Sequence, residues 1–480
     1  MEFRNVTIVD GTGAAPFVGD VVVEGDRIVE VSVSTPPADG PGQATGLVLA
    51  PGFIDVHTHD DVQLLSTPDM DFKTLQGVTS VVVGNCGFSA APSYADLPMG
   101  PSFATMTDYF AALDNEPAAV NATVLVGHGS VRSAVMGFKE NREATSDEMA
   151  AMSARVIEAL DAGAIGISSG LAYEPGRYSG PDEMKQLVGL VADAGGIYTT
   201  HMRNEANGLL DSIDESIAVA ETTGAPLQIS HLKASDRSVW GEVVPALEKI
   251  EAARARGVDV MFDQYPYTRG STFFDQVANS GAFEGQSEFG SLSPEEVLIA
   301  SAPGRPEWEG RTLAQVADDE GVDTRTMIDR IVTELDRRCV VILDRMCEED
   351  VQTVMSHPEM IVGSDGVYGG SRPHPRLHHT YPRILGHYVR ELGLLELPRA
   401  VQAMTSAAAK RFGFHDRGVI EAGAYADLVL FDPETIIDTG TYMDPKTVPT
   451  GIEGVWVNGT LVVENGAITG ERPGLALRHR

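Results

Sequence analysis

Two histidines at the end of a short apolar run are the first residues of this sequence whose types and spacing suggest chemistry. The stretch from Pro51 to Asp60 reads Pro-Gly-Phe-Ile-Asp-Val-His-Thr-His-Asp and places His57 and His59 one residue apart. Residues i and i+2 of a β-strand point to the same face. Both imidazoles can therefore approach one point beyond the end of the strand. Because imidazole is the commonest metal-binding side chain, the stretch predicts part of a metal site; one stacked and one exposed histidine is the alternative.

Further metal-binding or acidic side chains follow other apolar runs that have the character of buried strands. At the ends of these runs the sequence has Cys86, His128, the pair Ser168 and Ser169, His201, His231 and Asp365. Each has an ordinary structural explanation when taken alone, but together they predict one shared site. Cysteine and histidine suit Zn²⁺ with an open position for water, and zinc lowers the pKa of that water towards ~7. A carboxylate such as Asp365 can take up the proton and pass it on.

The elements that must position these side chains alternate between strand and helix. Predicted strands end near Val56, Asn85, Gly127, Ser168, Thr200, Ser230, Asp263 and Ser364, and helix-like segments lie at 146–162, 181–194, 207–223 and 243–253. Strands alternating with helices favour parallel β/α units. Eight such units predict a (β/α)₈ barrel of the TIM type, whose catalytic groups sit at the C-terminal ends of the strands.

The two ends of the chain have a different pattern, with short β-rich runs separated by turns. Residues 19–29 predict a hairpin with Gly25 and Asp26 in the turn, and residues 454–463 predict another around an Asn-Gly turn. We therefore expect a small β domain, a β-sandwich, built from residues 1–50 and 406–480. The barrel is expected at 51–405, with an insertion at about 275–355 before its last strand; this insertion covers one end of the barrel or forms an oligomer contact.

Composition narrows the class of protein. The 480 residues are 22% charged and 43% hydrophobic, as in globular proteins, and the net charge of −34 disfavours binding to nucleic acid or anionic membranes. No run approaches the roughly 18 apolar residues of a membrane span, no signal peptide is apparent, and three cysteines do not suggest a disulfide scaffold. A cytoplasmic location is expected. An anionic substrate would need local cations that stand out against this acidic background.

The sequence resembles the amidohydrolase superfamily and, within it, the N-acyl-D-amino-acid deacylase (D-aminoacylase) family. The motifs that carry the resemblance are spread over nearly the whole chain: residues 51–60, 84–87, 166–173, 200–203, 230–233, 265–272, 363–366, 374–376, 382–386 and 426–429. The resemblance implies that Cys86, His201 and His231 hold one tightly bound Zn²⁺. It implies that His57 and His59 flank a second, weaker metal position, and that Asp365 is the general base and acid.

The resemblance also implies how a substrate is held. Lys233, Tyr265 and Ser271 would bind the α-carboxylate, and Tyr173 and Arg376 would line the same pocket. For Arg376, the alternative to lining the pocket is a salt bridge to another residue behind the site. His128 and Arg132 are expected to be structural. Arg203 and Glu205 are expected either to orient His201 or to begin a helix.

The implied activity is zinc-dependent hydrolysis of N-acyl-D-amino acids, small molecules that yield a carboxylate and a free D-amino acid. The run at Phe273, Phe274 and Val277 favours apolar D side chains, whereas an acidic side chain would need a further cation, for which Arg269 is the candidate. The alternatives are an N-acyl-D-glutamate or N-acyl-D-aspartate deacylase, a cyclic amidase of the dihydroorotase or hydantoinase type, and a non-catalytic scaffold. The missing lysine on the fourth strand disfavours the cyclic amidase, and the intact ligand set disfavours the scaffold. No oligomeric state is predicted.

Overall fold

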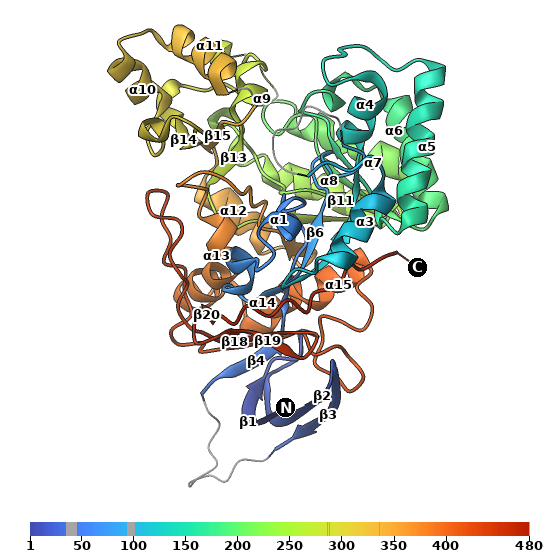
Figure 1. The fold of residues 1–480 in the computed structure, drawn as a ribbon, viewed down its shortest axis with the longest axis vertical. Helices are drawn as coiled ribbons and strands as arrows, with labels where there is room; N and C mark the ends of the chain where they lie inside the picture. Colours follow the sequence, from blue (N-terminus) through green and yellow to red (C-terminus); the bar gives the residue numbers. More distant parts are fainter. Residues whose placement is uncertain (35–45, 94–100, 286, 288, 336, 480) are drawn as a thin grey trace.

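A barrel of parallel strands occupies the middle of the computed structural model, which describes residues 1–34, 46–93, 101–285, 287, 289–335 and 337–479 (Figure 1). One sheet holds β5 (Phe53–Asp55), β6 (Val78–Val83) and β7 (Asn121–Val124), and the other holds β8 (Val126–Gly127), β9 (Gly166–Gly170), β10 (Ile197–His201), β11 (Leu227–Ile229), β12 (Val260–Gln264) and β16 (Met360–Val362). Only Leu125 separates β7 from β8. These two segments therefore act as one barrel strand.

The barrel closes between its first and last strands. The backbone N–H of Asp365 donates to the carbonyl of His57 at 2.7 Å, and the N–H of His59 donates to the carbonyl of Gly366 at 3.1 Å. This pairing confirms the predicted fold class and brings the segment after β16 beside the segment after β5. The side chains that follow the first and last strands therefore lie next to each other.

Helices cover the outside of the barrel because each has one apolar stripe. In α5 (Ser146–Ala162) the buried residues Met152, Val156 and Ala159 recur at helical spacing, a capping box of Thr145 and Glu148 begins the helix, and Gly163 ends it. The other helices around the barrel are α1 (Gln63–Ser66), α2 (Asp71–Thr74), α3 (Met106–Asn115), α4 (His128–Met136), α6 (Pro181–Asp193), α7 (Leu209–Thr223), α8 (Val243–Ala255), α12 (Glu348–Met355), α13 (Arg376–Arg383), α14 (Leu397–Met404) and α15 (Ser406–Phe412), with a π-helical segment at Ile384–Glu391.

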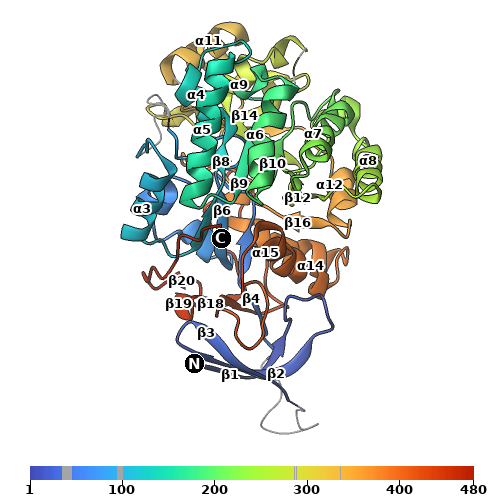
Figure 2. The same ribbon diagram turned by 90° about the vertical axis from the view of Figure 1, so that its right-hand side faces the viewer.

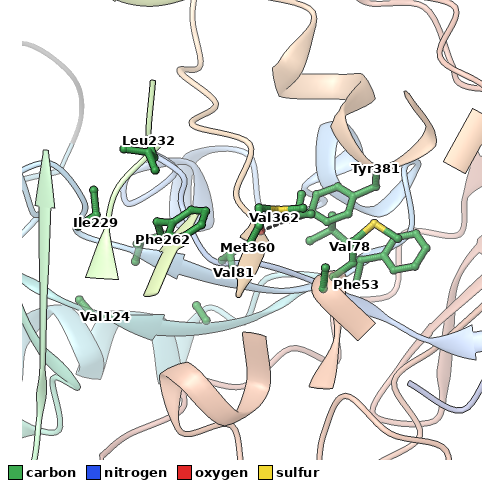
Figure 3. Close-up of a cluster of buried hydrophobic side chains, with 14 of the residues drawn as sticks. Phe53, Val78, Val81, Val124, Ile229, Leu232, Phe262, Met360, Val362 and Tyr381 are labelled. Carbon is green, nitrogen blue, oxygen red and sulfur yellow. Dashed lines mark hydrogen bonds between the residues drawn. The ribbon is translucent and has the colours of Figure 1, made fainter. Parts of the chain in front are cut away.

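Apolar side chains fill the barrel and its contacts with these helices (Figure 3). Phe53, Val81, Val124 and Phe262 come from four different strands, and all four are buried. Tyr381 of α13 stacks on Phe53 with ring centroids 5.4 Å apart, and its hydroxyl donates to the carbonyl of Ile54. The last helices are thereby fixed against the first strand.

The two ends of the chain pair in one sheet of eight strands, ordered β20-β19-β18-β17-β4-β1-β2-β3. Its strands are β1 (Glu2–Ile8), β2 (Phe17–Glu24), β3 (Arg27–Val33), β4 (Val48–Pro51), β17 (Leu428–Phe431), β18 (Ile452–Val457), β19 (Thr460–Glu464) and β20 (Ala467–Ile468). Antiparallel pairing of β17 with β4 joins the C-terminal strands to the N-terminal ones. Figures 1 and 2 show this sheet below the barrel.

The segment between β12 and β16 forms a small unit above the barrel, away from the eight-stranded sheet. It contains an antiparallel sheet of β13 (Arg269–Phe273), β15 (Val340–Asp344) and β14 (Val297–Ser301), together with α9 (Phe274–Ala278), α10 (Leu313–Glu320) and α11 (Thr324–Leu335). Phe274, Val277 and Trp308 belong to an apolar core of its own. Its first strand begins at Arg269, before the start suggested by the sequence. None of the described helices has the length and apolar content needed to cross a membrane.

Candidate metal centre and active site

Three side chains from three barrel strands meet at the top of the barrel. The Sγ of Cys86 lies 3.9 Å from Nδ1 of His201 and 3.6 Å from Nε2 of His231, and these two nitrogens are 2.8 Å apart. All three residues are buried. A thiolate and two imidazoles that share one point match the ligand chemistry of Zn²⁺.

A second group of donors shares Cys86 with the first. The Nε2 of His57 lies 3.2 Å from Sγ of Cys86 and 3.4 Å from a carboxylate oxygen of Asp365, and Nε2 of His59 lies 3.2 Å from the same oxygen. The donor atoms of this second group lie within 4.8 Å of one another. The structure thus brings every predicted metal ligand and the predicted base into two adjoining clusters.

The backbone at these strand ends is unusual. Cys86, His231 and Asp365 have φ angles of 52°, 37° and 50°, in the left-handed region that residues with a Cβ rarely adopt. Such strain persists only where the surroundings impose it, and it concentrates at functional sites. Here it turns the side chains inwards from the ends of the strands.

The histidines are oriented from behind by carboxylates. The Nδ1 of His231 lies 2.9 Å from Glu205, and the Nδ1 of His57 lies 3.1 Å from Asp263. In metal sites, a ligating histidine gives its second ring N–H to just such a carboxylate, which fixes the ring and its tautomer. The donor set and its supporting carboxylates therefore fit a metal ion.

The charges of the site keep the Cys86 thiol and the Asp365 carboxyl ionised. Burial opposes ionisation of the Cys86 thiol, but the neighbouring His57 and the hydrogen bonds from His201 and His231 outweigh it and hold the pKa of that thiol well below its usual value. Burial also opposes ionisation of Asp365, yet Arg376, together with the three histidines His231, His57 and His59, outweighs it and lowers the pKa of the carboxyl far below the usual range. A thiolate can bind a metal, and an ionised carboxylate can accept a proton.

The clusters open onto a pocket. Cys86, His59 and Asp365 line it together with Tyr173 and Ser271, two of the residues predicted to contact substrate. The remaining wall is largely apolar, with Phe88, Ala90, Phe138, Phe273 and Val367, and it also carries Asp61, Gln63, Asp275, Gln276 and Arg337. A small molecule in this pocket would reach both the thiolate and the carboxylate.

The chain is similar to known proteins along almost its entire length. A profile of the amidohydrolase family matches residues 43–291 and 248–463. The chain is 40% identical to a D-aminoacylase of Alcaligenes xylosoxydans xylosoxydans over 98% of its own length and 96% of that protein. This chain belongs to the amidohydrolase family, in its D-aminoacylase branch. The predicted family is thereby confirmed, and so is the predicted class of enzyme, a metal-dependent amidohydrolase.

Two further similarities bear on this amidohydrolase. The chain is 38% identical to an N-acyl-D-glutamate deacylase of the same organism, over 98% of this chain and 95% of that protein. A crystal structure of N-acyl-D-glutamate deacylase from Bordetella bronchiseptica, complexed with zinc and a phosphonate mimic of the tetrahedral intermediate, superposes with a TM-score of 0.90 at 37% identity and covers 99% of both chains.

The other residues predicted to hold substrate, Lys233, Tyr265 and Arg376, are not among those that line this pocket. Lys233 forms an ion pair with Glu205 at 2.7 Å and approaches Nδ1 of His231 at 2.8 Å. Arg376 pairs with Asp365 at 2.9 Å, which matches the salt-bridge role expected as its alternative to lining the pocket. Its guanidinium lies 4.4 Å from the centre of the Tyr265 ring, whose hydroxyl faces the sulfur of Met346 at 3.9 Å.

Several other predicted assignments can be compared with the structure of this amidohydrolase. His128 and Arg132 both contact Glu183 in a buried cluster, as expected for structural residues. Arg203 pairs with Glu215, so of these two residues only Glu205 lies beside the predicted metal ligands His201 and His231. Phe274 and Val277, whose apolar character was used to favour apolar D side chains, do not line the pocket, because α9 turns both into the core of the inserted unit. Only Phe273 of that apolar run reaches the pocket.

Three supporting residues were missed from the sequence. Asp263, at the end of the seventh barrel strand, carries the same positional signal as the other strand-end residues. Lys73 is fully buried and pairs with Asp55 at 2.6 Å and Asp60 at 3.1 Å, but nothing local distinguishes it from a surface lysine. Asp61 accepts from the N–H of Gly84 and lies two residues after His59, so proximity to the His-x-His motif is its only signal.

Proposed function

We propose that this enzyme hydrolyses the amide bond of N-acyl-D-amino acids, with zinc as its metal. The observation that carries the proposal is the convergence of Cys86, His201 and His231 beside Asp365 at the mouth of a pocket. The near full-length similarity to D-aminoacylase supports the same substrate class. The firmer metal position is assigned to these three ligands, with His57 and His59 beside a second, weaker one.

A bound zinc would supply an acidified water and a Lewis acid for the acyl carbonyl. The residues of the chain carry out the proton transfers. Asp365, ionised and held by Arg376 at 2.9 Å, accepts the proton of the attacking water and returns it to the departing amine. The surrounding burial keeps other water away from the reacting groups.

The substrate's α-carboxylate is assigned to Lys233, Tyr265 and Ser271. Lys233, which pairs with Glu205, and Arg376, which pairs with Asp365, flank the Tyr265 ring, with the Lys233 Nζ 6.0 Å from its centre. Two cations thus lie here in a chain of strongly negative net charge. The buried hydroxyl of Ser271 has no hydrogen-bond partner in the structure and is therefore available to an oxygen ligand. D selectivity would follow if this fixed clamp lets only one enantiomer place its amide at the metal.

An apolar D side chain is favoured over an acidic one. Phe88, Phe138, Phe273 and Val367 line the pocket. Arg269, the cation considered for an acidic side chain, is instead paired with Asp344 at 3.0 Å and lies over the ring of Tyr442 at 4.5 Å. The cyclic amidases remain the mechanistic alternative, and the presence of Ser168 and Ser169 on β9, with no lysine there, argues against them.

The proposal is tested by metal analysis joined to kinetics on a small substrate panel. Purified enzyme is expected to hold zinc and to show the highest kcat/KM on N-acetyl-D-leucine, D-methionine or D-phenylalanine. N-acetyl-D-glutamate, N-acetyl-D-aspartate and 5-substituted hydantoins serve as competitors. Faster turnover of the acidic substrates would transfer the assignment to an acidic-side-chain deacylase, and turnover of hydantoins alone would support the cyclic amidase.

A further inference from the structure

The turn that carries Cys86 is held in an unfavourable backbone conformation. Gly84, Cys86 and Gly87 have φ angles of 83°, 52° and 82°. The two glycines also pack too closely for any side chain. A Cβ on Gly84 would lie 2.1 Å from the carbonyl oxygen of Leu125, and one on Gly87 would lie 2.7 Å from the nitrogen of Gly170. The turn is thus wedged between the third and fourth barrel strands, and the thiol position depends on what holds it there.

The hydroxyl of Ser168, on β9, bridges the two ends of this turn. In a β-turn the first carbonyl commonly accepts a hydrogen bond from the fourth N–H. Here both groups bond to Ser168 instead, since its Oγ donates to the carbonyl of Gly84 and accepts from the N–H of Gly87 at 3.0 Å. One hydroxyl proton and one lone pair satisfy both bonds, and the side chain is completely buried.

We propose that Ser168 is a positioning residue that closes the Gly84–Gly87 turn and thereby fixes the Cys86 thiolate at the metal. The inference rests on the proposed function, because it presupposes that Cys86 ligates a metal. Ser168 itself lies outside both donor clusters and does not line the pocket. Its effect is therefore transmitted through the backbone of the turn.

Removing the hydroxyl would leave the Gly84 carbonyl and the Gly87 N–H buried and without this partner. Buried backbone groups without a hydrogen bond are energetically costly. A rearrangement of the turn that gives them new hydrogen-bond partners is therefore favoured. The Cys86 backbone already lies in the unfavourable left-handed region. It is therefore the part of the turn whose energy falls most when the turn rearranges. Loss of an outer partner of a metal ligand typically weakens metal binding by roughly 10- to 100-fold, and we expect that range for Ser168→Ala.

The neighbouring Ser169 provides a matched control. It is equally buried on the same strand, and its hydroxyl bonds to the hydroxyls of Tyr198 at 2.9 Å and Thr200 at 2.8 Å. Successive side chains of a strand point to opposite faces, so Ser169 has no bond to the turn. Ser169→Ala removes the same atom from the same strand and leaves Cys86 held.

The test measures zinc affinity by competition with a chromophoric chelator, and thiolate ligation by the thiolate-to-metal charge-transfer absorption of the cobalt-substituted protein. Ser168→Ala is expected to lose affinity and to weaken that absorption, whereas Ser169→Ala should retain both. Ser168→Thr keeps a hydroxyl and should restore both; it also serves where the alanine variant does not fold, as judged by circular dichroism.

Equal losses in Ser168→Ala and Ser169→Ala would overturn the inference, because a general loosening of β9 affects both. It would also be overturned if folded Ser168→Thr lost as much as the alanine variant, or if Ser168→Ala bound zinc as tightly as the unaltered protein. In that last case the proposed function stands. If the unaltered protein takes up no stoichiometric metal, the proposed function fails and this inference fails with it.

Discussion

Asp365 combines three contacts that suit a catalytic carboxylate. It lies within 3.4 Å of both His57 and His59 and pairs with Arg376 at 2.9 Å. Asp365→Asn removes the proton acceptor but keeps the size of the side chain. We expect kcat to fall by about 10²- to 10⁴-fold, the usual contribution of a general base, with zinc content unchanged. Retention of turnover at stoichiometric zinc would show that another group is the base.

Substitution of Lys233 tests whether this residue binds the substrate's α-carboxylate together with Tyr265 and Ser271. Its ammonium contacts Glu205 and His231 in the structure. Lys233→Met should raise KM much more than it lowers kcat, because it removes a charge that binds the substrate carboxylate in the ground state and the transition state alike. Lys233→Arg, which keeps the charge, should restore much of the lost affinity. A methionine variant with unchanged KM would remove Lys233 from the clamp.

The buried carboxyl of Asp275 is expected to make the stability of the protein depend on pH. Burial raises its pKa to about 6 from an ordinary 3.8, and Gln276 donates to it at 3.3 Å. A carboxyl with a raised folded-state pKa contributes stability below about pH 4, and this contribution is lost as the pH rises through about 6. Asp275→Asn should therefore raise the thermal midpoint more at pH 8 than at pH 4.5. Equal shifts at the two pH values would contradict this assignment.

At the scale of elements, a buried lysine connects the first and last barrel strands. Lys73 of α2 reaches Asp55 in β5, Thr58 and Asp60 in the following loop, and Ser364 after β16, all within 3.1 Å. Asp55 in turn accepts from the backbone N–H of Ser364. The network thus fixes the segments that carry His57 and Asp365 relative to each other.

Lys73→Met would leave two buried carboxylates without their cation. Breaking a buried ion pair from one side costs about 3–5 kcal/mol, so the free energy of unfolding should fall by that amount in urea titration. Lys249→Met removes a partly exposed lysine that pairs with Asp214 and should change stability by less than about 1 kcal/mol. Similar losses in both variants would mean that the buried network contributes no special stability.

Sequence patterns predicted the strand ends well because topology alone brings them together. Parallel strands of a barrel place their C-terminal residues on one rim, so Cys86, His201, His231 and Asp365 could be grouped without knowing any contact. Contacts that depend on tertiary placement could not be found in this way. Lys73 and Ser168 act on loops that are distant in the chain, and neither residue type nor spacing indicates such a partner.

The inserted unit shows that the sequence of a short apolar run does not reveal which of its side chains face the pocket. Phe273, Phe274 and Val277 are close in sequence, but the change from β13 to α9 between Phe273 and Phe274 sends only the first towards the pocket. A run this short does not distinguish strand from helix periodicity. The predicted lean towards apolar substrates therefore rests on pocket residues from several elements, including Phe88 and Val367, and no longer on this run.

At the scale of the whole molecule, the eight-stranded sheet and the inserted unit lie at opposite ends of the barrel (Figure 1). The donor clusters sit on the rim nearer the insertion, whose Phe273, Asp275 and Gln276 complete the pocket wall. The domain limits drawn from the sequence remain predictions. The family, the fold and the class of enzyme were all predicted from motifs distributed along the chain.

The central claim is that a metal held by Cys86, His201 and His231 supports hydrolysis of D substrates. The most direct measurement is chiral analysis of the amino acid released from racemic N-acetylmethionine by chelator-treated protein, before and after zinc is restored. We expect no release from the metal-free protein, and D-methionine alone after one equivalent of zinc. Release without metal, or release of L-methionine, would contradict the account.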